Sequence, residues 1–344
     1  MNYTEALRML TGIMTIPGFE RSAAKQISQS FGEYFDEIKV DSAGNIVLLK
    51  KCGRENAPKI MLDAHLDEVG MIVDGIYDGG FLSVSPVGGI DRQLLPASEV
   101  WIYGRETIYG VFAATPPHLV KPGEANKVPN WEEFRIDTGY TKEEISEIVE
   151  IGTPVGYYYS GEELLNGRIT GRGFDDKACA AGLLCAVSEM SPDELAGDVY
   201  ITLSAREEVG GGGAGCAAYA IKPDIAIITD VNFARTPGVA GEESGKFEEG
   251  PMISLSAVTD RRLTAKVLDV AKTAEIKVTT VVEATSTGTN ASCVVLIDEG
   301  VPAAVVSIPL AGMHSYNEML SVTDAEAFVK LIREIIKTSD ILNV

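Results

Sequence analysis

Five places in the sequence bring a histidine or a carboxylate to the end of an apolar segment or to the start of a helix. The residues at these places are His65, Asp175 with Asp176, Glu207 with Glu208, Asp230 and His314. Imidazole and carboxylate groups without a thiolate suit Zn²⁺, Co²⁺ or Mn²⁺. A buried carboxylate without a partner is costly, and a divalent cation removes that cost. So many acidic groups favour a pair of cations about 3.5–4 Å apart that share one bridging aspartate.

Each of these residues also has an ordinary structural interpretation when it is taken alone. A carboxylate at a strand end is usually solvated, a pair such as Glu207–Glu208 is typical of an exposed face, and a histidine after a strand is often structural. The coincidence of all five favours a shared site, because ligands of parallel sheets bind outside the carboxyl ends of the strands. The remaining histidine, His118, follows two prolines and is expected to be structural or to lie at a subunit contact.

Two other chemistries lack the motifs that they need. The segment 210–214, GGGGA, has no following lysine of a phosphate-binding loop, and it comes after two glutamates, which repel phosphate. The serines lack the GxSxG context of a serine hydrolase. The glycine-rich segment is therefore interpreted as a turn before a helix.

The apolar segments alternate with helical patterns along most of the chain. Apolar residues at three- and four-residue spacing predict helices over 2–32, with a break at Pro17–Gly18, and over 176–190, 213–220, 261–273, 290–298 and 322–338. Short apolar or alternating runs predict strands within 36–50 and at 58–65, 198–205, 224–229, 251–257, 275–282 and 303–308. Strands that alternate with helices predict an α/β fold with a mainly parallel sheet and helices on both faces.

The stretch from about 70 to 163 has a different texture. Short β-like pieces are separated by glycine and proline, and a Glu-rich stretch runs from Glu124 to Glu150. This pattern predicts a small β-rich unit inserted into the α/β domain. We therefore expect one domain made of residues 1–69 and 164–344 and an inserted domain of residues 70–163.

The composition disfavours several classes of function. Lys and Arg total 29 against 50 Asp and Glu, so the formal net charge is −21, which disfavours binding to nucleic acid or to an anionic membrane surface. The sequence has no apolar run of about 18 residues for a membrane span and no basic and apolar leader at its start. Its five cysteines lack a CxxC pair, so we expect a cytoplasmic protein whose cysteines are buried fillers.

Five motifs in order, AHLDEVG, GFDDKA, EEVGGGGA, TDV and HSYNEM, together resemble those of the tetrahedral (TET) aminopeptidases. This family of dinuclear metallopeptidases includes glutamyl aminopeptidase and the deblocking aminopeptidases. The similarity covers almost the whole chain, including the turn GVFAATPPHL of the insert. It implies a hydrolase that removes N-terminal residues from peptides with a free N-terminus. It also implies a fold of the zinc-peptidase type, with an inserted β-barrel-like domain through which subunits form dimers.

The resemblance further implies a set of metal ligands. These are His65 and Asp230 for one metal and Glu208 and His314 for the other, with Asp175 as the bridge. Asp176 follows Asp175, often across a cis peptide bond in related enzymes, and is the alternative bridge. The implied cofactors are two divalent metal ions per subunit, Zn²⁺ in the first place and Co²⁺ or Mn²⁺ as alternatives.

Two further residues have implied roles in catalysis. Glu207 would be the general base that activates water, and Asp67 would orient His65. In this family six dimers form a hollow dodecamer, so a homo-oligomer is expected.

Departures from the family pattern concern the substrate pocket. Asn232–Phe233 and Asn290–Ala291 differ from the residues that other members carry, so the preferred N-terminal residue stays open. Some relatives carry an endoglucanase label. The alternative function is therefore a glycoside hydrolase that uses paired carboxylates such as Glu207 and Asp67.

Overall fold

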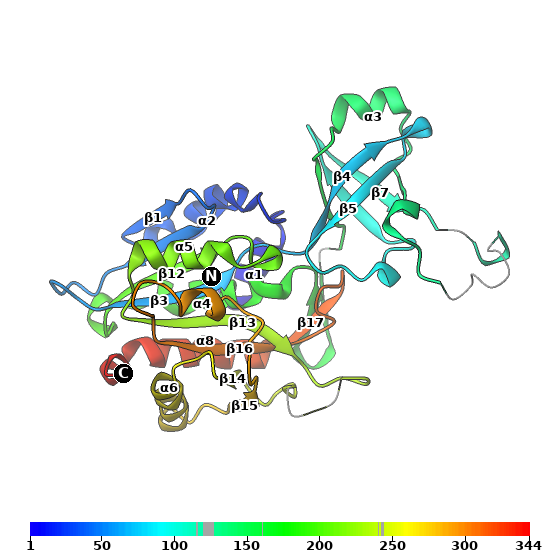
Figure 1. Ribbon diagram of the computed structural model, residues 1–344. Coiled ribbons are helices and arrows are strands. Elements are labelled where there is room, and N and C mark those ends of the chain that lie inside the picture. The colour runs from blue at the N-terminus through cyan, green and yellow to red at the C-terminus, as the bar shows by residue number, and fades with distance from the viewer. Residues whose placement is uncertain (115, 120–126, 160, 240, 242–243) are drawn as a thin grey trace.

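The chain folds into an α/β body from which a small β-barrel projects (Figure 1). The computed structural model describes residues 1–114, 116–119, 127–159, 161–239, 241 and 244–344. The first part of the predicted Glu-rich stretch, 124–126, and Thr115 of the insert's turn lie outside the described residues. Within the described ranges, no helix is both long and apolar enough to cross a membrane.

The body is built on an eleven-stranded sheet in the described part of the chain. At its centre, four neighbouring parallel strands stand in the order β12 (Asp198–Ser204), β3 (Lys59–His65), β13 (Ile225–Phe233) and β16 (Ala303–Ala311). These strands are apolar almost throughout because helices bury them on both faces. The other strands of the sheet are β1 (Glu37–Val40), β2 (Ile46–Lys50), β10 (Glu162–Leu164), β11 (Arg168–Gly171), β14 (Met252–Leu255), β15 (Thr279–Val282) and β17 (Glu318–Ser321).

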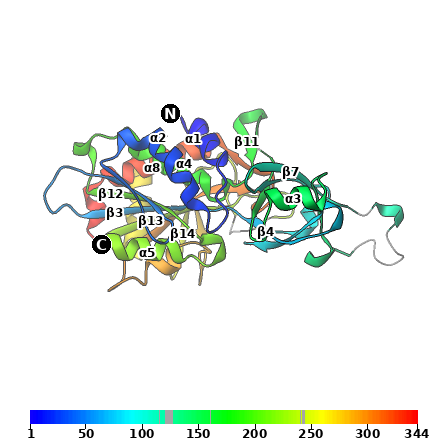
Figure 2. The same cartoon turned by 90° about the horizontal axis from the view of Figure 1, so that it is seen from above.

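Helices cover both faces of the sheet, as the sequence predicts (Figures 1 and 2). On one face lie α1 (Tyr3–Thr11), α2 (Ala24–Phe31), α4 (Phe174–Ser188), α6 (Arg261–Thr273) and α8 (Val322–Lys337). On the other face lie α5 (Gly212–Ile221) and α7 (Ala291–Val294). Helix α4 is buried on all sides, and its small residues allow close approach to the sheet, to α1 and to α8. At Gly182, for example, a larger residue would collide with the Phe328 ring of α8.

The projecting unit is a closed antiparallel barrel. Its strands follow the order β4 (Gly70–Ile76), β5 (Leu82–Val87), β8 (Ile136–Asp137), β7 (Thr107–Phe112), β6 (Glu99–Tyr103) and β9 (Pro154–Tyr157). Helix α3 (Lys142–Ile148) lies beside it. Alternating side chains of these strands fill a hydrophobic core separate from that of the body. The α/β fold with an inserted β-rich unit is thus confirmed, whereas the domain boundaries and the dimerisation role stay predictions.

Several predicted elements differ from the structure. The predicted helix 290–298 is reduced to the single turn of α7, and Leu296, just beyond it, is 78% exposed. The predicted strand 275–282 begins only at Thr279, since Glu275 takes a left-handed conformation just after α6. Strand β13 continues through Asp230 to Phe233 instead of ending before it. Cys216 is exposed rather than buried.

A buried ion cluster fastens the start of α4 to the segment that follows β3. Arg172 Nη1 contacts both carboxylate oxygens of Glu68, and Lys177 Nζ donates to Glu68 Oε1 at 2.8 Å and to the Ile13 carbonyl at 2.9 Å. Gly173 takes φ = 62°, and a side chain there would collide with the Glu68 carboxylate. Burial alone would raise the pKa of Glu68, but the two cations outweigh it and lower that pKa to about 2. Burial lowers the pKa of Lys177 to about 8. The attraction of Glu68 raises this pKa, but repulsion from Arg172 opposes it.

Glu68→Gln is expected to lower the free energy of unfolding by about 3–5 kcal/mol, because it leaves two buried cations without their counter-charge. The pKa of the Glu68 carboxyl is lower in the folded protein than in the unfolded chain, so its charge stabilises the fold at pH values above the pKa in the unfolded chain. This stabilisation by Glu68 is lost as pH falls from about 5 towards 2. Urea unfolding of both proteins over this range should show their difference shrinking. The control Glu163→Gln removes the exposed partner of Arg8 and should cost less than about 1 kcal/mol. An equally small loss for Glu68→Gln would contradict the expectation.

Candidate metal centre

The four central strands bring the predicted residues to one edge of the sheet. His65 ends β3, Asp230 lies in β13, Glu208 follows β12 and His314 follows β16. Ile228 of β13 pairs with Asp63 of β3, so Asp230 and His65, each two residues further on, lie level with one another. The neighbouring order of the strands explains why residues more than 200 positions apart converge.

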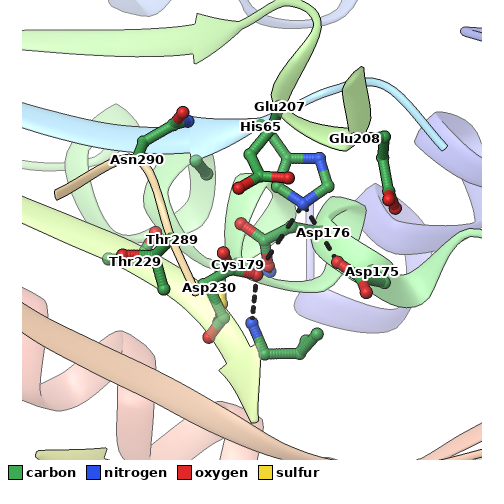
Figure 3. A network of polar contacts seen from close by, with 12 residues as sticks. His65, Asp175, Asp176, Cys179, Glu207, Glu208, Thr229, Asp230, Thr289 and Asn290 are labelled. Carbon is green, nitrogen blue, oxygen red and sulfur yellow. Dashed lines mark hydrogen bonds and ion pairs between the residues drawn. The ribbon is translucent and has the colours of Figure 1, made fainter. Parts of the chain in front are cut away.

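His65, Asp175 and Asp230 form a first buried cluster. His65 Nε2 lies 3.0 Å from Asp175 Oδ1 and 3.7 Å from Asp230 Oδ1. The three side chains are 2%, 7% and 8% exposed. In Figure 3 both carboxylates lie beside the same edge of the His65 ring. One ligand atom from each residue lies within 4.8 Å of the others, close enough to bind a common metal ion.

Asp175, Glu208 and His314 form a second cluster. His314 Nε2 lies 3.2 Å from Asp175 Oδ2 and 3.4 Å from Glu208 Oε2. One ligand atom from each of these residues again lies within 4.8 Å of the others. Asp175 therefore belongs to both clusters, with Oδ1 facing His65 and Oδ2 facing His314. Asp176 belongs to neither cluster, and the peptide bond between these two aspartates is cis.

Asp67 holds the segment that carries Glu207 and Glu208. Its two carboxylate oxygens accept hydrogen bonds from the backbone N–H groups of Glu207 and Glu208, both at 3.1 Å. His65 Nδ1 lies 2.9 Å from the Asp67 carbonyl oxygen but 3.7 Å from its carboxylate. The backbone of Asp67 thus contacts the imidazole more closely than its side chain does. The Asp67 carboxylate mainly positions the two glutamates.

Glu207 stands beside the clusters without belonging to either. It is partly buried and lines a cavity of about 640 Å³ together with the ligands of both clusters. Burial, with repulsion from Asp230 and Asp175, raises the pKa of the Glu207 carboxyl to about 7. A carboxyl with this pKa is suited to proton transfer near neutral pH.

Burial and neighbouring charges shift the pKa values of the residues in both clusters. Burial, and then Asp175, raises the pKa of Glu208 to about 8, and burial raises that of Asp230 to about 6. Burial opposes protonation of His65, but Asp175 and Asp230 outweigh it and raise the pKa well above its usual value. The hydrogen bond to Asp175 raises the pKa of His314 to about 9. Burial destabilises the carboxylate charges, and a positive charge between them would offset this.

The donor set fits divalent cations. Glu208 Oε1 is buried and has no hydrogen-bond partner among the described residues. Each cluster offers one imidazole nitrogen and carboxylate oxygens, without a thiolate, which suits Zn²⁺, Co²⁺ or Mn²⁺. The two clusters have three residues each and share one aspartate, which is also how protein ligands are arranged around a pair of metal ions.

Comparison with known proteins also indicates a peptidase. The model of the M42 glutamyl aminopeptidase family matches residues 44–331, which is most of the chain. The chain is a member of the M42 peptidase family. The resemblance to the TET aminopeptidases noted from the motifs is therefore confirmed.

Relatives of this M42 chain include aminopeptidases from archaea. Lysyl aminopeptidase of Pyrococcus furiosus is 31% identical over 307 residues, which cover 88% of this chain and 87% of that protein. The TET aminopeptidase of Thaumarchaeota archaeon SCGC AB-539-E09 has a TM-score of 0.92 and 30% identity, covering 99% and 98% of the two chains. The TET1 peptidase of Pyrococcus horikoshii, which can assemble into a tetrahedron or a large octahedral shell, has a TM-score of 0.86 and 30% identity, with 97% and 99% covered. A structure described as an endoglucanase also matches.

Sequence reasoning assigned no role to Glu318, although it lies within the HSYNEM motif. This residue of β17 is only 1% exposed. Its carboxylate accepts the backbone N–H groups of Phe174 at 2.6 Å, Asp175 at 3.2 Å and His314 at 2.8 Å. Glu318 therefore fixes the backbone of two members of the second cluster. In the sequence, only its position four residues after His314 could have indicated a role for Glu318.

A second buried group lies behind the site and includes Asn290, which the sequence associates with the substrate pocket but which does not line the cavity. Asn290 Nδ2 donates to Asp63 Oδ2 at 2.9 Å and to Ser204 Oγ at 3.0 Å. All three residues are buried, and burial raises the pKa of Asp63 to about 7. These bonds attach the segment before α7 to β3 and β12. The wall of the cavity that this segment forms is thereby anchored to the sheet.

Proposed function

We propose that this M42 peptidase removes N-terminal residues from peptides with the help of two divalent cations. The observation that carries the proposal is the shared position of Asp175, whose two oxygens face the two histidines of neighbouring clusters. His65 and Asp230 would complete one metal site, and Glu208 and His314 the other. Zn²⁺ is the proposed physiological metal, with Co²⁺ or Mn²⁺ as alternatives.

The residues of the chain divide the chemistry among them. Divalent cations in these clusters would lower the pKa of a water and polarise the scissile carbonyl group. Glu207 acts as the general base, takes a proton from the attacking water and returns it to the leaving amine. Asp67 holds Glu207 at the correct place through its backbone N–H. Glu318 keeps Asp175 and His314 in register.

The alternative of a glycoside hydrolase is weakened by the state of Asp67. The Asp67 side chain is 0% exposed, and both its oxygens accept backbone hydrogen bonds. A pair of glycosidase carboxylates must flank a glycosidic bond within the substrate cleft. Asp67 does not line the cavity, so the proposed pair of Glu207 and Asp67 does not fit this role.

Chelation separates the two activities. EDTA is expected to abolish hydrolysis of aminoacyl-p-nitroanilides, and Zn²⁺, Co²⁺ or Mn²⁺ should restore it after the chelator is removed, because the clusters lose their function without cations. Measurements of released nitroaniline with a panel of N-terminal residues and each metal provide the test. A peptidase activity that EDTA leaves intact would refute the proposal. Release of reducing sugar from a cellulose-like substrate that is unaffected by EDTA would instead favour the glycosidase.

We further propose that the barrel mediates a dimer and that dimers build a dodecamer. The barrel carries an aromatic cluster of Trp101, Tyr109 and Tyr158, of which the two tyrosines are each 40% exposed. Exposed aromatic groups are typical of contact surfaces. Light scattering is expected to give the mass of a dimer or of a multiple of dimers, and a monomer at all concentrations would contradict this. A cytoplasmic location remains a prediction from the sequence.

A further inference from the structure

One carboxylate in the cavity belongs to neither metal cluster and takes no part in the proposed proton transfer. Glu283 follows the end of β15, where its backbone N–H donates to the Leu255 carbonyl at 3.1 Å. Its side chain lines the same cavity as the two clusters.

The position of Glu283 is set by the strand that carries Asp230. Asn232 is 9% exposed, and its Nδ2 donates to Glu283 Oε1 at 2.9 Å. Side chains two residues apart on a strand share a face and lie about 6–7 Å apart. Asp230 and Asn232 both line the cavity, together with Val231 and Phe233 at this end of the strand. Glu283 therefore stands about one strand repeat beyond the proposed metal ligand, on the same wall.

The carboxylate of Glu283 is only half satisfied. Oε2 is buried and has no hydrogen-bond partner among the described residues. Among the described residues that line the cavity there is no lysine or arginine to balance its charge. A carboxylate without a counter-charge is costly where burial removes it from water, and a cationic ligand group in the cavity would reduce that cost. The chemistry of this wall thus favours an ammonium or guanidinium group.

We propose that Glu283 selects a basic N-terminal residue, lysine or arginine, in the substrate. This inference rests on the proposed peptidase function. A substrate whose scissile carbonyl lies near the clusters would direct its first side chain along this wall. Lysine has a flexible four-carbon stem that spans about one strand repeat. Phe233 and Met313 line the cavity and provide apolar surface for the stem. An acidic side chain would meet the Glu283 carboxylate and be repelled.

Kinetics with matched p-nitroanilides of lysine, norleucine and glutamate test the inference. Norleucine keeps an unbranched apolar chain but lacks the charge. We expect the metal-loaded wild type to hydrolyse the lysine substrate with a kcat/KM about 10–100-fold above that for norleucine, as a hydrogen bond to a charged group predicts. The glutamate substrate should be the poorest. The preference should appear mainly in KM, because the contact is made before and during the reaction.

Glu283→Gln should reduce the lysine-to-norleucine ratio to about one, because it removes the charge and keeps the shape. Glu299→Gln removes an exposed glutamate outside the cavity and should keep the wild-type ratio. A wild-type ratio near one, or an equal fall for both substrates in Glu283→Gln, would overturn the inference and leave the peptidase proposal intact. Failure of the wild type to hydrolyse any of the three substrates would overturn both.

Discussion

Glu207→Gln is expected to lower kcat by about 10²–10⁴-fold, the usual contribution of a general base. Glutamine has the shape of glutamate but cannot take the proton from water. Glu207 belongs to neither cluster, so the variant should retain its metal ions. Steady-state hydrolysis of an aminoacyl-p-nitroanilide measures the loss, and elemental analysis after dialysis measures the metal content.

The pH profile offers an independent test of Glu207. The base must be ionised to act, so activity of the wild type should rise with pH through the pKa of this carboxyl. Burial raises that pKa to about 7, and nearby cations would draw it down because they favour the charged form. We therefore expect an acidic limb below pH 7 in the wild type, which the residual activity of the variant lacks.

A control with the same chemical change makes the result for Glu207 specific. Glu132→Gln alters an exposed glutamate of the inserted unit and should keep the wild-type kcat. Near-wild-type turnover of Glu207→Gln, with the fold shown intact by circular dichroism, would exclude Glu207 as the base. A loss of turnover together with loss of metal would also contradict the proposed division between ligands and base.

Asp175→Asn is expected to abolish metal binding at both proposed sites, because one side chain belongs to both clusters. The variant should also lose more than about 10–100-fold in kcat/KM, which is the loss typical when a residue that hydrogen-bonds to a metal ligand is changed. Isothermal titration with Zn²⁺ measures the number and affinity of the sites. In contrast, Glu208→Gln changes the second cluster alone and should retain one site.

The neighbouring aspartate provides the matched control. Asp176 is also buried but belongs to neither cluster. Asp176→Asn should therefore keep two titratable sites, whatever its effect on thermal unfolding. Loss of both sites in Asp176→Asn but not in Asp175→Asn would assign the bridge to the other residue. Loss of a single site in Asp175→Asn would show that the two clusters do not share a ligand.

The order of the strands decided which sequence predictions for the site could succeed. Parallel strands place their carboxyl ends at one edge of the sheet, so His65, Glu208 and His314 could be expected to meet from local patterns alone. Asp230 was found by the same reasoning, although its strand runs on to Phe233. The early end of α7 was missed, because helical periodicity around Leu296 is not matched by burial.

The sequence by itself determined the class of fold and the kinds of ligand. Alternating apolar and helical segments predict an α/β body, and histidines with carboxylates after apolar runs predict a metal site. These features are local, because each depends on residue type and on spacing within one segment.

Only the tertiary structure decided how the polar groups of the site divide their contacts. It places Asp175 rather than Asp176 between the clusters, directs the Asp67 carboxylate to the backbone of Glu207 and Glu208, and leaves one oxygen of Glu283 without a partner among the described residues. The contacts of Asp175 with the two histidines and of Asp67 with Glu207 and Glu208 join residues more than 100 positions apart. They depend on the register of paired strands and on which atoms burial deprives of water, and neither can be derived from spacing along the chain.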